Sequence, residues 1–97
     1  MPTDHAKGAI ARRHRNANGT VCLRVTGLAR PFATNDNLFN HWITAVNGCS
    51  NNIGIQVCYY GTRKCISMDV PSRGQREAIL GILPSIKDFR YEYTERF

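Results

Sequence analysis

The sequence predicts a small α+β domain whose elements follow the order strand, helix, strand, strand, helix, strand. Three observations lead to this prediction. Alternating apolar and polar residues mark four segments as half-buried strands, apolar residues at a spacing of four mark a helix before Asn47-Gly48, and a serine-based capping pattern marks a second helix after residue 72. A chain of 97 residues fits one domain of this kind and is too short for two.

The first predicted strand covers Thr20–Thr26, because the apolar residues at 21, 23 and 25 alternate with more polar neighbours. A helix is expected to begin near residues 34 and 35, whose side chains are favourable N-caps, and to end at Asn47-Gly48. Leu38, Trp42 and Val46 would form its apolar stripe, which places Trp42 in the core.

The later elements complete the pattern. They are expected as a strand over Ile53–Tyr60, a hairpin turn at Gly61-Thr62, a strand over Arg63–Val70, a helix that starts at the Ser72-Arg73-Gly74-Gln75 capping box and ends at Pro84, and a strand over Phe89–Thr94. Such an order predicts a ferredoxin-like βαββαβ fold, a four-stranded antiparallel sheet with both helices on one face. The other face of the sheet would be open to partners.

Composition divides the chain into two parts and suggests a partner. Residues 1–19 are polar and basic and are expected to form a flexible N-terminal tail, with the domain in residues 20–97. The net charge is +6, and ten of the 13 basic residues are arginines, whose guanidinium groups match phosphate and stack on bases. Charge therefore favours a nucleic acid partner. The short apolar runs exclude a membrane-spanning helix, and no signal peptide is expected.

Cysteine and histidine spacing predicts neither a metal site nor a redox motif. Cys22, Cys49, Cys58 and Cys65 contain no CxxC pair, and the three histidines are scattered. We expect reduced thiols in an intracellular protein, where buried cysteines act as small apolar residues. A disulfide framework in a secreted protein is the alternative.

The sequence contains no recognisable catalytic apparatus. It has no glycine-rich phosphate loop, no HExxH motif, no nucleophile beside an obvious base, and no convincing pair of carboxylates. We therefore expect a protein that is not an enzyme and that needs no cofactor.

Several segments resemble the RNA recognition motif (RRM) family. Leu23-Arg24-Val25-Thr26-Gly27-Leu28 looks like the first-strand motif of that family, and Lys64–Ile79 is similar to its third strand and second helix. The turn Leu28-Ala29-Arg30-Pro31-Phe32 also looks like that of the Acinus-type RRM. The resemblance covers residues 20–94 and is carried mainly by the order of elements. It implies RNA binding on the open sheet face, where RRM aromatics stack on bases.

The chain departs from the family at the positions that would carry these aromatics. Arg24 occupies the first-strand aromatic position and Gly27 the asparagine position, while Arg63 and Cys65 occupy the two third-strand aromatic positions. Stacking on an aromatic contributes about 1–3 kcal/mol per base. Without it, the resemblance implies weak, electrostatic RNA binding or a domain that holds a protein partner.

These observations predict a noncanonical RRM-like module for RNA processing or ribonucleoprotein assembly, in the nucleus or another RNA-processing compartment. The alternatives are a module of the same fold that binds a protein in such a complex, and an acylphosphatase-like enzyme. Arg30 would be the phosphate-binding arginine of that enzyme, although its Gly-Trp-Val-x-Asn segment is absent. The candidate RNA-binding residues are Arg24, Arg63 and Tyr60 on the sheet, and Lys7, Arg12, Arg13 and Arg15 in the tail.

Overall fold

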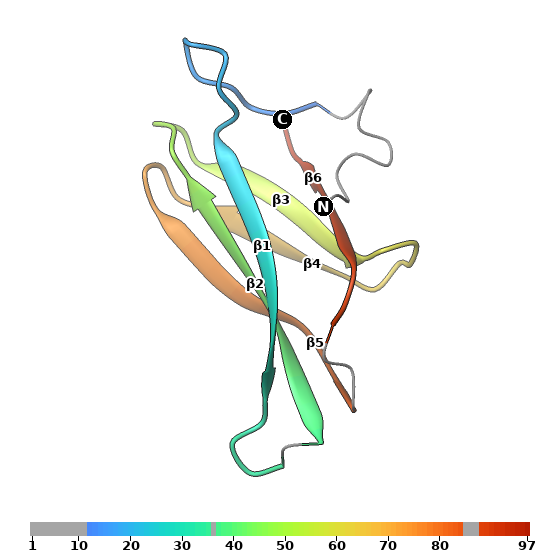
Figure 1. Cartoon of the computed structure of the whole chain (residues 1–97). Helices are drawn as coiled ribbons and strands as arrows, with labels where there is room; N and C mark the ends of the chain where they lie inside the picture. The colour runs from blue at the N-terminus through green and yellow to red at the C-terminus, as the bar shows by residue number, and fades with distance from the viewer. Residues whose placement is uncertain (1–11, 36, 85–87) are drawn as a thin grey trace.

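The computed structural model of the chain consists of β-strands (Figure 1). It describes residues 12–35, 37–84 and 88–97, and within these ranges it contains no helix. The predicted ferredoxin-like α+β fold is therefore wrong. The strands are β1 (Leu23–Pro31), β2 (Leu38–Asn47), β3 (Ile53–Tyr59), β4 (Cys65–Val70), β5 (Gln75–Pro84) and β6 (Tyr91–Glu95).

The strands form two antiparallel three-stranded sheets. One sheet has the order β1-β2-β5 and the other has the order β4-β3-β6, so β2 and β3 are the central strands. The inner faces of both sheets contribute to one apolar core, which makes the fold a β-sandwich. The fully or largely buried apolar residues of this core are Cys22, Leu23, Ile43, Ala45, Ile53, Ile55, Val57, Met68, Val70 and Leu80.

The first predicted helix is strand β2, and the apolar spacing explains the error. Leu38, Trp42 and Val46 recur every four residues, and four is a multiple of the strand period of two as well as close to a helical turn. In β2 these residues lie on the outer face of the sheet, whereas Ile43 and Ala45 point into the core. Trp42 is therefore half-buried on the outer face and is not the core residue that the helix predicted.

The second predicted helix is strand β5, and its expected cap is a turn. The Gly74 N–H donates to the Pro71 carbonyl, and Arg73 has a φ of 56°, which reverses the chain between β4 and β5. The serine at 72 therefore belongs to a turn between two strands and caps no helix. Proline at 84 is the last residue of β5, an edge strand where a missing N–H is tolerated.

Strands β3 and β4 confirm the sequence prediction for the middle of the chain. Ile53, Ile55 and Val57 are buried on one face of β3, and the hairpin turn falls at Gly61-Thr62. In this turn Gly61 has a φ of 70°, a conformation that glycine adopts without strain.

All four cysteines are paired, which contradicts the expectation of reduced thiols. Cys22 is bonded to Cys49, and Cys58 is bonded to Cys65 on the neighbouring strand. The first bond joins the segment before β1 to the loop after β2, and the second joins directly opposed residues of β3 and β4. Sequence spacing missed both pairings because they depend on the sandwich topology.

Candidate functional site

The sandwich separates the residues that were expected on one RNA-binding sheet. Arg24 lies on β1 of the first sheet, whereas Arg63 and Tyr60 lie in the turn between β3 and β4 of the second. All three side chains are exposed, but the expectation that Arg24 and Arg63 share one sheet face is wrong, because β1 and the β3–β4 hairpin belong to different sheets. The structure therefore contains no sheet platform built from these residues.

Two of the basic residues near the N-terminus, Arg12 and Arg13, lie against the C-terminal end of the chain. The Arg13 guanidinium donates from Nη2 to the Tyr93 hydroxyl at 2.8 Å, and its Nε lies 3.6 Å from the Glu95 carboxylate. The Arg12 guanidinium lies 4.2 Å from the centre of the Phe97 ring. Arg15 is exposed and donates to the Gly19 carbonyl, and Lys7 lies outside the described residues. The Arg13 guanidinium is therefore already engaged by Tyr93 and Glu95 of the chain itself.

Glu95 is the anchor for this segment. Its side chain is only 1% exposed, and one of its oxygens accepts the His14 backbone N–H at 2.6 Å and lies 2.7 Å from His14 Nδ1. The His14 ring also stacks on Phe97. A buried carboxylate needs such partners, because an unpaired charge in the interior is costly.

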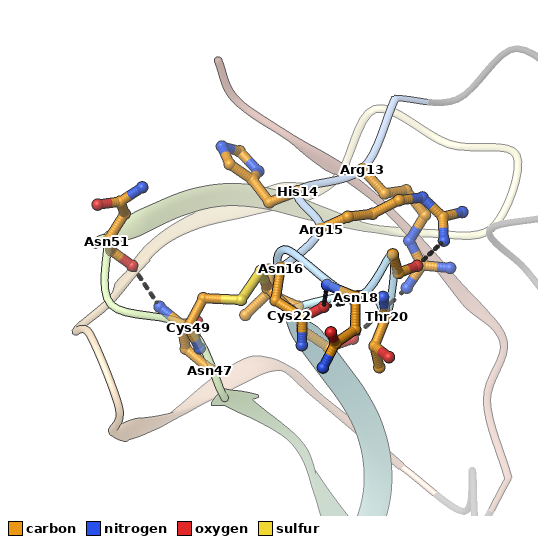
Figure 2. Close-up of a disulfide and its surroundings, with 12 residues drawn as sticks. Arg13, His14, Arg15, Asn16, Asn18, Thr20, Cys22, Asn47, Cys49 and Asn51 are labelled. Atoms are coloured by element: carbon orange, nitrogen blue, oxygen red, sulfur yellow. Dashed lines mark hydrogen bonds between the residues drawn. A yellow bond between two sulfur atoms is a disulfide. The ribbon is translucent and has the colours of Figure 1, made fainter.

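A polar pocket of about 440 Å³ opens beside this anchored segment, near the start of β1 and the end of β2. Figure 2 shows the Cys22–Cys49 disulfide between the N-terminal segment and the loop that carries Asn51. The pocket is lined by His14, Arg15, Asn16, Ala17, Asn18, Cys22, Gly48, Cys49, Ser50, Asn51, Ile53 and Arg73.

An exposed apolar row crosses the outer face of the β1–β2–β5 sheet. Leu28, Trp42 and Ile79 are cross-strand partners on β1, β2 and β5 and form what we call the apolar row. Leu28 is 54% exposed and Ile79 is 37% exposed, and Ile82 beside the row is 46% exposed. Sequence reasoning missed this row because it assigned Leu28 to a turn and placed Trp42 and Ile79 on helices.

Arginines flank the apolar row. The Arg30 guanidinium lies 5.5 Å from the centre of the Trp42 ring, a cation–π arrangement. Arg24 lies on the same face of β1, four residues before Leu28. The acid of this face, Glu77, accepts a hydrogen bond from the Thr44 hydroxyl at 3.2 Å. The face therefore combines apolar side chains with excess positive charge.

The free edge of strand β1 is covered near its middle by the Tyr91 and Phe89 side chains. The Tyr91 hydroxyl donates to the Val25 carbonyl at 3.0 Å. A side chain at Gly27 would meet the Phe89 and Tyr91 rings at 2.9 Å, so this glycine is what lets the two rings approach the strand. Pro31 then ends the strand without an N–H donor. These features oppose strand addition at this edge and leave the outer face as the accessible surface.

No family model, curated protein or solved structure matches this chain. The candidate sites therefore rest on the geometry alone.

Metal-ligating side chains and paired ionisable side chains are the groups of the described residues that bear on catalysis. No group of three His, Cys, Asp or Glu side chains within these ranges could hold a metal ion. His41 and Tyr59 form a close pair, with 2.7 Å between His41 Nδ1 and the phenol oxygen, but His41 is fully buried in the core. Burial raises the pKa of Tyr59 above its usual value, which favours the neutral phenol. No helix in the described ranges is long and apolar enough to span a membrane.

Proposed function

We propose that this chain is a non-enzymatic binding module that docks an acidic protein partner on the outer face of the β1–β2–β5 sheet. The observation that carries the proposal is the apolar row of Leu28, Trp42 and Ile79, which crosses all three strands and is exposed at both ends. Contiguous exposed apolar side chains on a small domain are typical of interaction sites.

The residue types of the face support a protein partner. Tryptophan and arginine are enriched among the residues that dominate binding energy at protein interfaces. Here Arg30 and Trp42 lie together, and the planar guanidinium offers two parallel donors that suit a carboxylate. Because Glu77 is hydrogen-bonded to Thr44 and two arginines share the face, charge complementarity favours an acidic partner over a basic one.

Site-specific photo-crosslinking tests where the partner docks. A photoreactive amino acid replaces Leu28, and a matched one replaces Gln56, an exposed residue on the central strand of the other sheet. We expect a protein to crosslink from position 28 and not from position 56. That protein is then purified and its affinity for the chain is measured. Equal crosslinking from both positions, or crosslinking only to a second copy of this chain, would contradict the proposal.

Binding measurements with the purified partner provide the second part of the test. We expect Leu28→Ser with Ile79→Ser to weaken binding at least tenfold, about 1.4 kcal/mol, because both side chains would be desolvated at the interface. The control is Tyr60→Ser, which removes an exposed apolar side chain from the distant β3–β4 turn. Unchanged binding by the double variant, or equal weakening by the control, would contradict docking on this face.

Contact with RNA is a second candidate function that rests on charge. Arg24, Arg63 and Arg73 are exposed, but they lie on separate parts of the fold. Such scattered phosphate contacts would give weak binding without base recognition. Salt-dependent filter binding to single-stranded RNA tests this function, and no detectable binding at low salt would exclude it.

The two disulfides support the proposal that the protein is located in an oxidising compartment and not, as the sequence predicted, in the nucleus. Structural disulfides persist in secreted and periplasmic proteins and are rare where glutathione keeps thiols reduced. Mass spectrometry with a thiol-alkylating reagent, applied to protein from its native source, is expected to find no free thiol.

A further inference from the structure

The polar pocket is built from three parts of the chain that meet near the start of β1 and the end of β2. The N-terminal segment supplies His14 to Asn18, the loop after β2 supplies residues 48–51, and the turn before β5 supplies Arg73. The Cys22–Cys49 disulfide and Ile53 are the apolar groups of its lining. Its volume of about 440 Å³ lies within the range of sites for small molecules and far exceeds the space that a single ion needs.

The lining is polar, and its charged side chains are both basic. Arg15 and Arg73 are positively charged, and no Asp or Glu belongs to the lining. Asn16, Asn18, Asn51 and Ser50 add amide and hydroxyl groups that both donate and accept hydrogen bonds.

Some of these groups are fixed and others are available to a ligand. The Asn16 side-chain oxygen accepts the backbone N–H groups of Asn18 and Thr20, at 2.9 and 3.0 Å, which leaves its amide nitrogen as a donor. Within the described ranges, the side chains of Asn18, Ser50, Asn51 and Arg73 make no hydrogen bond or ion pair with the protein. The pocket therefore holds unpaired polar groups beside its two arginines.

The walls of the pocket are held in place before any ligand arrives. Asn47 is buried, its amide nitrogen donates to the Asn51 carbonyl at 2.7 Å, and its side-chain oxygen accepts the Cys49 N–H at 2.9 Å (Figure 2). The Arg73 N–H donates to the Cys49 carbonyl at 2.9 Å, which ties the turn to the same loop. A site fixed in this way loses little conformational entropy when it binds.

We infer that this pocket binds a small sugar that carries an acidic group. The acidic group matches the Arg73 guanidinium, because a charge-assisted bond from arginine to an oxyanion is the strongest that the lining offers. Arg15 adds positive charge, while its Nη1 donates to the Gly19 carbonyl. Sugar hydroxyls match the Asn18 and Asn51 amides, which donate and accept in the same way. The disulfide at Cys49 gives the lining an apolar part that suits the C–H face of a sugar ring.

Titration of the full chain, followed by backbone amide NMR spectra, tests this inference with four probes: glucuronate, glucose 6-phosphate, glucose and inorganic phosphate. We expect glucuronate or glucose 6-phosphate to shift the Asn18, Asn51 and Arg73 signals in a saturable manner, at least tenfold more tightly than glucose. The inference is overturned if neither acidic sugar binds more tightly than glucose. Inorganic phosphate that binds as tightly as the acidic sugars would overturn the role of the sugar ring.

A charge-removing variant identifies the pocket as the binding site. Arg73→Asn removes the guanidinium and suits the left-handed backbone at this position, since asparagine tolerates a positive φ. We expect it to weaken acidic-sugar binding at least fivefold with an unchanged melting temperature. The matched control Arg63→Asn lowers the net charge equally, at the β3–β4 turn outside the pocket lining, and is expected to change binding less than twofold. Equal losses in both variants would show a general charge effect and overturn the site.

The affinities for the acidic sugars and for glucose must be compared at constant ionic strength, because salt screens the attraction between an anion and exposed arginines.

The length of the natural ligand is determined by a separate measurement. If an oligomer of glucuronate binds more tightly per sugar unit than the monomer, the ligand is the end of an acidic polysaccharide chain. If the two bind equally, the ligand is a free acidic sugar.

Discussion

At the scale of single residues, one end of the core depends on a cluster of rings around a histidine. His41 is fully buried, its ring stacks on Phe89 with 4.2 Å between centres, and its Nδ1 lies 2.7 Å from the Tyr59 hydroxyl. The hydroxyl fits here because the facing residue on β5 is Gly81, where a side chain would collide with the Tyr59 ring and oxygen. The pair is thus a packing and hydrogen-bonding unit between the two sheets.

The close approach to Gly81 predicts a destabilising substitution. Gly81→Ala would place a methyl group against Tyr59, and because Tyr59 is held by His41, overpacking is expected to cost about 1–3 kcal/mol of unfolding free energy. Denaturant unfolding measures this loss. The matched control is Gly48→Ala, whose added carbon would lie 3.7 Å from the Cys22 carbonyl oxygen, an ordinary contact. Equal stabilities of the two variants would contradict the packing described here.

The raised pKa of Tyr59 predicts how stability depends on pH in alkaline solution. Desolvation favours the neutral phenol in the folded state, so its contribution to stability is complete below the ordinary pKa of 10.0. Above that pH the unfolded chain loses this proton first, and stability falls. Tyr59→Phe is therefore expected to flatten the decline of unfolding free energy between about pH 9 and pH 11. Tyr60→Phe removes one exposed phenol and is the control; an equal flattening would count against the assignment.

At the scale of elements, the sequence predicted the strands of the second sheet well. In the first sheet it predicted the first part of β1 and took β2 and β5 for helices. In Ile53–Tyr60 the apolar residues at 53, 55, 57 and 59 recur at every second position, which is the period of a strand and not of a helix. In Leu38–Asn47 the even spacing of apolar residues fits a helix and a strand equally, and the β-branched and aromatic residues there favour the strand that forms. The local pattern could not decide between a helix and a strand, because the choice depends on strands that are formed by distant parts of the sequence.

The candidate sites were predicted even less completely than the strands. Arg30 was noticed in the sequence only as a possible phosphate ligand, and its contact with Trp42 requires the β1–β2 register. Arg73 was read as part of a helix cap, and its place in the pocket requires the loop after β2. Both sites are assembled from residues that are distant in sequence, and no local spacing encodes such proximity.

The anchoring of the N-terminal segment on β6 predicts the effect of removing one charge. Glu95→Gln keeps the shape of the side chain but loses the charge that faces Arg13 and His14. Because the carboxylate is buried and its partners are about three-quarters buried, we expect a loss of about 1–3 kcal/mol of unfolding free energy. Thermal unfolding measures it, and faster amide exchange near residue 14 would accompany it. Asp88→Asn, at an exposed position, is the control, and an equal effect there would contradict the anchor.

At the scale of the whole molecule, two cross-links stabilise a sandwich with a modest core. The Cys22–Cys49 bond spans 27 residues and the Cys58–Cys65 bond spans 7. A bond that closes a longer loop removes more entropy from the unfolded chain. The first bond also fixes the polar pocket, whereas the second reinforces a hairpin that strand pairing already forms.

The difference in loop length predicts an order of stabilities. Replacing Cys22 and Cys49 together by alanine is expected to cost about 3.5 kcal/mol, against about 2.5 kcal/mol for the Cys58 and Cys65 pair. Urea unfolding of the two double variants under identical conditions measures both costs. Equal or reversed costs would show that chain entropy does not set the order.

The strand order also determines when the chain can finish folding. The hairpin of β1 and β2 forms from neighbouring residues, but its sheet is complete only when β5 arrives; likewise the hairpin of β3 and β4 must wait for β6. Contacts between such distant segments slow folding, because a long loop must close before they form. During synthesis the hairpin of β1 and β2 therefore exposes an apolar face until the strands of the other sheet have been made and cover it. The Cys22–Cys49 bond can form as soon as the first hairpin has been made, and it would hold that half of the molecule together in the interval.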